Sequence, residues 1–170
     1  MMMVNNKIKV VPLTTHLPLK KVSKSISEKL IIETSQLIKR TLKKDFGIDN
    51  PKIAITGLNP HSGDKGLLGN EEKKTIIPAI KKCKTKKIRI YGTISADSSF
   101  IKSNVQLYDG FLCMYHDQAL IAAKVIDFEN TVNYTAGLSF VRTSPDHGTG
   151  YEIARKFIAN ESSLISAINT

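Results

Sequence analysis

The sequence has little cysteine and no long apolar run. Its two cysteines, Cys83 and Cys113, fall in a predicted helix and a predicted buried strand, so we expect no disulfide framework and a reducing, cytoplasmic location. No stretch reaches about 18 apolar residues, which predicts that no helix spans a membrane. The first seven residues lack the apolar centre of a signal peptide. With 170 residues, 41% of them hydrophobic, the chain suffices for one globular domain.

Arginine is also scarce, although the formal net charge is +10. Only four of the 25 basic residues are arginines, and the lysines are spread along predicted helices, most densely at 81–87. Neither zinc-finger spacing nor the aromatic motif of an RNA-binding sheet accompanies them. We therefore interpret the charge as solvated helix surface, with a nucleic-acid-binding surface as the weaker alternative.

Short apolar segments alternate with segments of helical period along the chain. Strands are predicted at 7–13, 52–58, 88–94 and 110–114, with a hairpin formed by 132–135 and 139–142. Helices are predicted at 27–46, 71–84, 101–108, 119–126, 151–157 and 162–168. Ser27 is the expected N-cap of the first helix, and Gly47 suits its C-terminal end. The alternation predicts an α/β fold with three α/β/α layers around a mostly parallel sheet.

Three of the four histidines stand just after a predicted strand. His16 follows the first strand, His61 the second and His116 the fourth. Ligands bind at the carboxyl ends of strands in open α/β sheets. Neutral imidazole is a common metal ligand, and three histidines with an open position are typical of a catalytic metal site. The alternative, that these histidines cap loops or hydrogen-bond to a substrate, stays open on spacing alone.

Two carboxylates occupy similar positions. Asp117 adjoins His116, and Asp97 lies in the loop after the third strand. Either can orient an imidazole, bind a metal or transfer a proton. For Asp97, an Asx turn within the loop is an equally good alternative.

Cationic and polar anchors follow the His116 strand. They are Lys124, Asn133 and Arg142. An arginine there can contact a phosphate or a carboxylate with two parallel hydrogen bonds, and a structural salt bridge is the alternative.

Two loops contain several glycines, at 59–70 and at 146–150. Glycine allows a backbone to approach a ligand closely, and the second loop precedes a predicted helix whose N-terminus would favour an anion. Neither loop is a P-loop or a GxGxxG turn after a strand.

Five segments together resemble the 4-hydroxythreonine-4-phosphate dehydrogenase family of vitamin B6 biosynthesis. They are TTHLPL (14–19), GLNPHSGDKGLLGNEE (57–72), SADSSF (95–100), YHDQALIAAK (115–124) and VNYTAGLSFVRTSPDHGTG (132–150). They follow the family's order and spacing and cover nearly the whole chain. The resemblance implies that residues 1–170 form a single α/β unit corresponding to the C-terminal half of the family chain, with the N-terminal half absent. The implied fold is similar to that of isocitrate and isopropylmalate dehydrogenases.

The resemblance also implies roles for individual residues. It implies a homodimer that binds a divalent metal (zinc, magnesium or cobalt) through His16, His61 and His116. The metal site is expected at the subunit interface, with His116 supplied by the partner. The remaining implied roles are substrate binding by Lys124, Asn133 and Arg142, proton transfer by Asp97, Asp117 or Lys124, and binding of NAD or NADP by His147, Gly148 and Thr149.

The reaction implied by the resemblance is NAD(P)-dependent oxidation of the C3 hydroxyl of 4-phosphooxy-L-threonine. Loss of carbon dioxide from the β-keto acid then gives 3-amino-2-oxopropyl phosphate. Two alternatives are a phospho-threonate or phospho-erythronate dehydrogenase, which shares these motifs, and a truncated remnant that keeps the histidines without catalysis. A separately encoded N-terminal half is a further possible partner, because a half enzyme would expose apolar surface.

Overall fold

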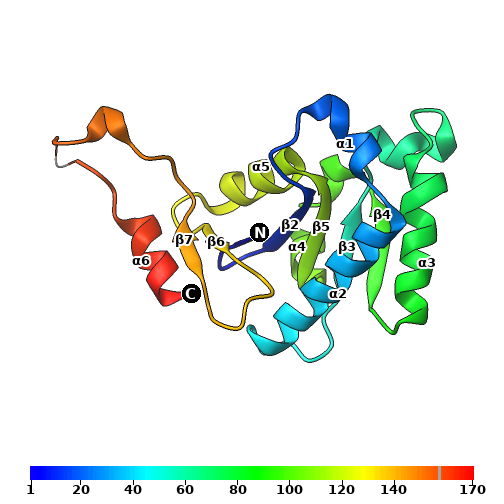
Figure 1. Cartoon of the computed structure of the whole chain (residues 1–170), viewed down its shortest axis with the longest axis horizontal. Coiled ribbons are helices and arrows are strands. Elements are labelled where there is room, and N and C mark those ends of the chain that lie inside the picture. The colour runs from blue at the N-terminus through cyan, green and yellow to red at the C-terminus, as the bar shows by residue number, and fades with distance from the viewer. Residues whose placement is uncertain (157) are drawn as a thin grey trace.

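The structure is a computed structural model that describes residues 1–156 and 158–170 (Figure 1). Its strands are β1 (Met2–Val4), β2 (Lys9–Thr14), β3 (Ile53–Thr56), β4 (Ile90–Ile94), β5 (Gly110–Tyr115), β6 (Val132–Tyr134) and β7 (Thr143–Pro145). Its α-helices are α1 (Leu19–Ser25), α2 (Glu28–Lys44), α3 (Ile77–Thr85), α4 (Lys102–Leu107), α5 (His116–Asp127) and α6 (Ser162–Asn169). Shorter turns are η1 (Pro60–Gly66), the π-helical η2 (Glu72–Ile76), η3 (Ala96–Ser98) and η4 (Tyr151–Ile153).

The described strands form one mixed sheet in the order β4-β3-β5-β2-β1-β6-β7. β4, β3, β5 and β2 are parallel neighbours, whereas β1, β6 and β7 continue the sheet through antiparallel pairs. The direction reverses at β1, again at β6 and again at β7, so five strands run the same way, and β1 and β7 run the other way. The predicted mostly parallel sheet is therefore confirmed, with β4, β3, β5 and β2 as its parallel part. The antiparallel part, made of β1, β6 and β7, lies on the side of the molecule where the chain ends (Figure 1).

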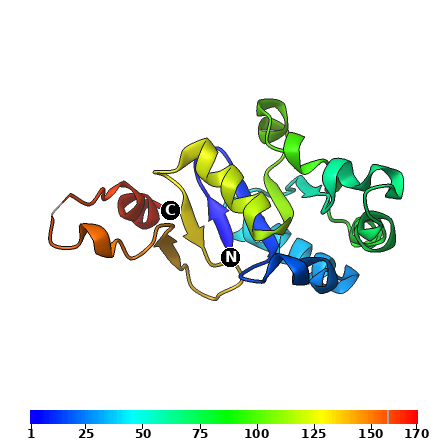
Figure 2. The same cartoon turned by 90° about the horizontal axis from the view of Figure 1, so that it is seen from above.

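Helices cover both faces of the sheet, which confirms the three layers. Successive strand residues point to opposite faces, so Ile53 and Ile55 join the buried cluster under α1, α2 and α3, whereas Ala54 joins the cluster under α5. From α5, Ala119 and Ala123 are fully buried in that second cluster. Figure 2 shows α2 and α5 on opposite sides of the strands.

The α2 helix begins as predicted. The Ser27 hydroxyl accepts a hydrogen bond from the Leu30 amide at 3.2 Å, and Glu28 lies in the first turn, where a carboxylate favours the helix dipole. The helix ends at Lys44, and Gly47 adopts a positive φ of 69° as the chain turns away. The expected cap and stop are both confirmed.

The N-terminal region contains two elements that the sequence interpretation missed. Residues before β2 form β1, which pairs antiparallel with it across a turn where the Asn5 side chain accepts from the amides of Lys7 and Ile8. Asparagine is typical of such a turn, but the three residues of β1 are too few to show the alternation of apolar and polar side chains that predicts a strand. The second missed element is α1, which starts directly after Pro18.

Two predictions near the C-terminus were wrong. The second hairpin strand is β7 rather than 139–142, because the connection is longer and Thr135 donates to the Arg142 carbonyl just before pairing begins. The predicted helix at 151–157 forms only the single turn η4, because the chain leaves helical geometry at Ala154, where ψ is 136°, and Arg155 follows with a φ of +68°. Residue 157 lies outside the described part of the chain.

Candidate functional site

The carboxyl ends of the four parallel strands lie at one edge of the sheet, and each leads to a predicted site residue. His16 follows β2, His61 follows β3, Asp97 follows β4, and His116 is the first residue of α5 directly after β5. The predicted helix at 119–126 therefore begins three residues earlier than expected. Parallel pairing thus gathers chemistry from four distant segments at the edge where α/β proteins bind ligands.

His16 and His116 lie next to each other at this edge. Their ring centres are 5.7 Å apart and their planes are inclined by 46°. The pairing of Thr14 with Tyr115 sets this proximity, and the Thr14 hydroxyl donates to the Met114 carbonyl at 2.9 Å. His16 adopts a positive φ of 52°, which turns the chain after β2.

The two imidazoles fit two positions of a metal centre. Two histidines on one tetrahedral ion place their ring centres roughly 5 Å apart, given a metal–nitrogen bond of about 2 Å. A third ligand is not supplied by the same cluster: within residues 1–156 and 158–170, no group of three His, Cys, Asp or Glu side chains is arranged to hold an ion. The expectation that one histidine comes from a partner subunit, and that this one is His116, stays a prediction.

Asp117 orients the His116 ring. Its carboxylate lies 2.7 Å from His116 Nδ1, so that nitrogen carries the proton in the favoured tautomer and leaves Nε2 as the free ligand atom. Carboxylates that hold histidine ligands in this manner fix the ring and raise its basicity. Of the three roles that the sequence left open for Asp117, this contact fits the orienting one, which stays a prediction.

Gln118 ties the ends of β3 and β5 together. Its Oε1 accepts from the Met114 amide at 2.9 Å and from the Thr56 hydroxyl at 3.1 Å, and its Nε2 donates to the Gly57 carbonyl at 3.0 Å. One side chain therefore links the segment leading to His61 with the helix turn that carries His116. The sequence analysis quoted Gln118 within a motif but gave it no role.

His61 lies in a turn with unusual backbone geometry. Residues 61–65 all have positive φ, from 37° at Asp64 to 79° at Gly63. Only one of the five is glycine, and a left-handed conformation costs other residues about 1–2 kcal/mol each. Such strain persists where surrounding contacts determine the conformation, and it is concentrated at functional sites.

The buried carboxylate of Glu72 contacts this turn. Glu72 lies at the start of the helix predicted at 71–84, but it is only 2% exposed and its side chain reaches into the loop. Its Oε1 accepts from the amides of Leu58 and Asn59, both at 2.8 Å, and its Oε2 accepts from the Asn59 side chain at 2.9 Å. In the sequence, the only indication of this contact is that Glu71 and Glu72 end the glycine-containing segment 57–72.

A hollow of about 360 Å³ opens at the carboxyl edge. His61 and Asp97 both line it, together with Tyr115 and Gln118. A neighbouring hollow of similar volume extends along α5 from Asp117 to Ile126 and shares Tyr115 and Gln118 with the first. The sequence-predicted Asp97 therefore faces the same space as His61.

The predicted substrate anchors lie farther from the histidine pair. Lys124 stands two turns along α5 from His116, roughly 12 Å along the helix axis, and its ammonium pairs with the Asp146 carboxylate at 3.2 Å. Arg142 is exposed in the hairpin and donates to the Thr135 hydroxyl at 2.9 Å. The Oδ1 atom of Asn133 is buried and has no hydrogen-bond partner within the described part of the chain.

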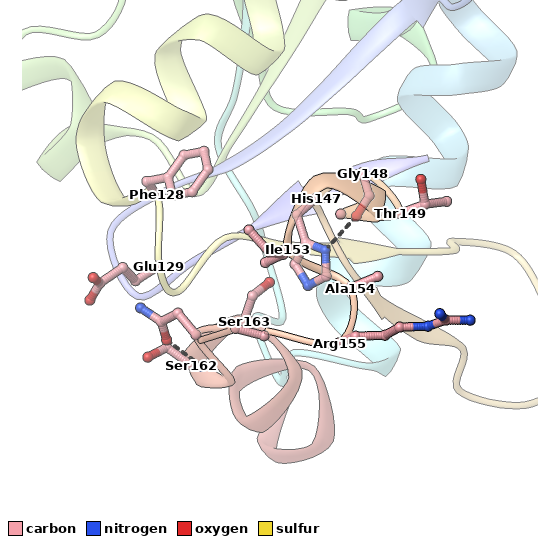
Figure 3. Close-up of a pocket in the computed structure, with 13 residues that line it drawn as sticks. Phe128, Glu129, His147, Gly148, Thr149, Ile153, Ala154, Arg155, Ser162 and Ser163 are labelled. Carbon is pink, nitrogen blue, oxygen red and sulfur yellow. Dashed lines mark hydrogen bonds between the residues drawn. The ribbon is translucent and has the colours of Figure 1, made fainter. Parts of the chain in front are cut away.

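The predicted cofactor residues line a separate and larger hollow. Its volume is about 760 Å³, and it lies between the end of α5, the 147–155 loop and the start of α6. Figure 3 shows His147, Gly148 and Thr149 across the hollow from Phe128 and Glu129. The His147 ring lies 2.9 Å from the Gly148 carbonyl through Nδ1.

No helix in the described residues combines the length and apolar character needed to cross a membrane.

Comparison with known proteins shows matches along the whole chain. Residues 1–170 match the family model described as pyridoxal phosphate biosynthetic protein PdxA. The chain is 48% identical over 168 residues to the 4-hydroxythreonine-4-phosphate dehydrogenase of Bacteroides thetaiotaomicron, covering 99% of this chain and 46% of that protein. Its identity to the enzyme of the same name from Sulfurihydrogenibium sp. is also 48%, covering 52% of that protein.

A solved structure shares the fold. The 4-hydroxythreonine-4-phosphate dehydrogenase of Klebsiella pneumoniae superposes with a TM-score of 0.87 at 36% sequence identity, over 99% of this chain and 51% of that one. The chain thus spans about half the length of the relatives it matches.

Proposed function

From the premise that this chain belongs to the pyridoxal phosphate biosynthetic protein PdxA family, we propose that it supplies the metal- and substrate-binding half of a 4-hydroxythreonine-4-phosphate dehydrogenase. In the proposed reaction, the C3 hydroxyl of 4-phosphooxy-L-threonine loses its proton to a base while the C3 carbon transfers its hydrogen as a hydride to NAD⁺ or NADP⁺, which leaves a ketone at C3. The resulting β-keto acid loses carbon dioxide, and protonation of the enolate gives 3-amino-2-oxopropyl phosphate. The relatives named above support this choice of reaction.

The observation that carries the proposal is the pair of His16 and His116, with Asp117 holding the second ring. Two adjacent imidazoles, one of them held by a carboxylate, fit two of the ligand positions of a divalent-metal site. A divalent ion bound there would supply Lewis-acid stabilisation for the negative charge that develops on the substrate oxygen. Imidazole ligands favour zinc or cobalt over magnesium. His61 is proposed as the third ligand of the complete centre.

Asp97 is the proposed base for the substrate hydroxyl. It faces the hollow that His61 also lines, so a substrate bound to the metal site would present its hydroxyl to this carboxylate. Asp117 is less suited to accept the proton, because its carboxylate already accepts from the His116 ring.

Lys124, Asn133 and Arg142 are proposed to bind the substrate. Two contacts support this proposal. The Lys124 ammonium is held by the Asp146 carboxylate, and Asn133 Oδ1 is buried without a hydrogen-bond partner in the described residues, so a substrate donor could bind to it. Arg142 offers an exposed guanidinium that suits a phosphate or a carboxylate. Lys124 is also a possible proton donor to the enolate.

The hollow beside His147, Gly148 and Thr149 is the proposed position of NAD or NADP. Its glycines permit close approach of a ligand to the backbone, and its volume lies within the usual range for small-ligand sites. The choice between NAD and NADP is part of the test below.

We propose that this chain alone does not make the complete enzyme. The relatives are about twice as long, so we propose that further chain supplies the other wall of the cleft. We also propose a homodimer in which a histidine from a second copy completes the metal centre. Because His16 and His116 of one chain already lie together, we propose His61 for that role in place of the His116 that the resemblance implies.

The direct test uses the purified chain with and without the N-terminal half of a relative. We expect about one zinc or cobalt ion per chain, and reduction of NAD⁺ or NADP⁺ with 4-phosphooxy-L-threonine once the second half is added. His16→Ala should lower zinc affinity by more than about tenfold and lower turnover with it, whereas His147→Ala, outside the metal site, should retain the metal. Metal-free wild-type protein, or turnover that prefers phospho-threonate, would overturn the proposal in its present form.

A further inference from the structure

Glu72 is a buried carboxylate whose partners all belong to one loop. It accepts from the amides of Leu58 and Asn59 and from the Asn59 side chain. In the described residues, no Lys, Arg or His nitrogen comes within 4 Å of it. A carboxylate that is 2% exposed without an ion-pair partner is costly to bury, and its hydrogen bonds to N–H groups offset that cost.

The other side of the same carboxylate lies against the left-handed turn. A Cβ atom added to Gly63 would stand 2.7 Å from Glu72 Oε2, so only glycine lets the backbone pass this close. Likewise, a Cβ atom added to Gly69 would stand 2.3 Å from the side-chain nitrogen Nδ2 of Asn59. The loop is therefore wrapped around Glu72, with 58–59 on one side and Gly63 on the other.

His61 stands between these two contact points. Asn59 is fixed two residues before it and Gly63 two residues after it, while 61–65 keep positive φ angles. Contacts on both sides explain how four non-glycine residues hold a strained conformation. Glu72 itself does not line the hollow that His61 faces, so it acts through the loop and not on a ligand.

We propose that Glu72 is a positioning residue that holds the His61 turn in the geometry needed for metal binding. This inference rests on the proposed function, in which His61 is a ligand of the divalent ion. It deepens that proposal by assigning the shape of the turn to a single buried carboxylate.

The test compares Glu72→Gln with the control Glu33→Gln in the full chain. Glutamine keeps the size and one acceptor oxygen, but its NH₂ group faces the Asn59 NH₂ donor in place of an acceptor. Glu33 is an exposed carboxylate of α2 whose ion pair is with Lys29, so its variant makes the same charge change away from the loop. Gly63→Ala is a second, independent disruption, because its Cβ displaces the carboxylate.

Two readouts separate positioning from general stability. Amide hydrogen exchange at Leu58 and Asn59 needs no metal, and we expect at least tenfold faster exchange in Glu72→Gln and Gly63→Ala. Zinc affinity, measured by competition with a chelating dye, should fall at least tenfold in the same variants. Combined with His61→Ala, Glu72→Gln should cause no further loss, whereas combined with His16→Ala its effect should remain additive.

The outcomes are distinguishable. Wild-type zinc affinity in Glu72→Gln, or unchanged exchange at 58–59, overturns the positioning role while leaving the proposed function intact. Additive losses with His61→Ala overturn it as well, since they assign Glu72 a separate effect. A wild-type chain that binds no zinc overturns the proposed function and, with it, the assignment of Glu72 to a metal site.

Discussion

His16 and His116 follow the ends of two neighbouring parallel strands, β2 and β5, and their ring centres are 5.7 Å apart. The strand register that aligns Thr14 with Tyr115 produces this proximity, so the pair is a product of the sheet and not of loop flexibility. Each histidine is therefore expected to contribute separately to metal affinity.

The first prediction follows from this pair. His16→Ala and His116→Ala should each lower zinc affinity by more than about tenfold, because each removes one ligand from the ion. Isothermal titration calorimetry with zinc measures the change. His147→Ala is the matched control, since its ring contacts the Gly148 carbonyl in another hollow. Equal affinities in wild type and His116→Ala would show that this pair does not hold the ion.

A second prediction concerns the carboxylate behind the pair. Asp117→Asn keeps the shape of the side chain but removes the charge that stabilises the His116 tautomer 2.7 Å away. Loss of such a supporting carboxylate lowers metal affinity by about 10–100-fold. The same titration should show this loss without a large change in melting temperature, because Asp117 is exposed. Unaltered affinity would contradict an orienting role.

How much of this site could be predicted depends on the range of the interactions. The positions of the three histidines after predicted strands followed from local pattern, because parallel strands share an edge. The hydrogen bond from Gln118 to the Gly57 carbonyl joins residues that are 61 positions apart, and no local sequence pattern predicts such a contact. The burial of Glu72 was missed for the same reason: an acidic residue at the start of a helix is usually solvated and faces the dipole.

The third prediction tests the tie between strands. Gln118→Ala should lower the free energy of unfolding by about 1–3 kcal/mol, since it leaves the Met114 amide and the Gly57 carbonyl without their side-chain partner. Urea denaturation followed by circular dichroism measures the loss. Gln106→Ala, an exposed position on α4, should change stability by less than about 0.5 kcal/mol. Similar losses of unfolding free energy in both variants would refute a stabilising role for the Gln118 hydrogen bonds.

A fourth prediction concerns pH. Burial raises the pKa of the Cys113 thiol from 9.0 to about 12. The folded state thus keeps its proton more tightly than the unfolded state, so this contribution to stability is complete below pH 9 and is lost as pH rises toward 12. Relative to Cys113→Ala, the wild type should lose about 1.4 kcal/mol between pH 7 and pH 10. A pH-independent difference between the two proteins would refute the raised pKa.

The last prediction concerns the outer face of α5. Ile121 and Val125 are 62% and 81% exposed on successive turns of the helix whose first residue is His116. Exposed apolar stripes of this kind mark association surfaces, and a second copy packed along α5 would lie next to the metal-binding edge. Val125→Asp should therefore yield a monomer in light scattering and lower zinc affinity together.

The matched control for that variant is Leu19→Asp, which places the same charge on an exposed leucine of α1, on the opposite face of the sheet. It should leave both the mass and the zinc affinity unchanged. A dimer that persists in Val125→Asp would place the interface elsewhere. A monomer that keeps wild-type zinc affinity would instead show that the metal centre is complete within one chain, and His61 would then have to reach the His16–His116 pair from its own loop.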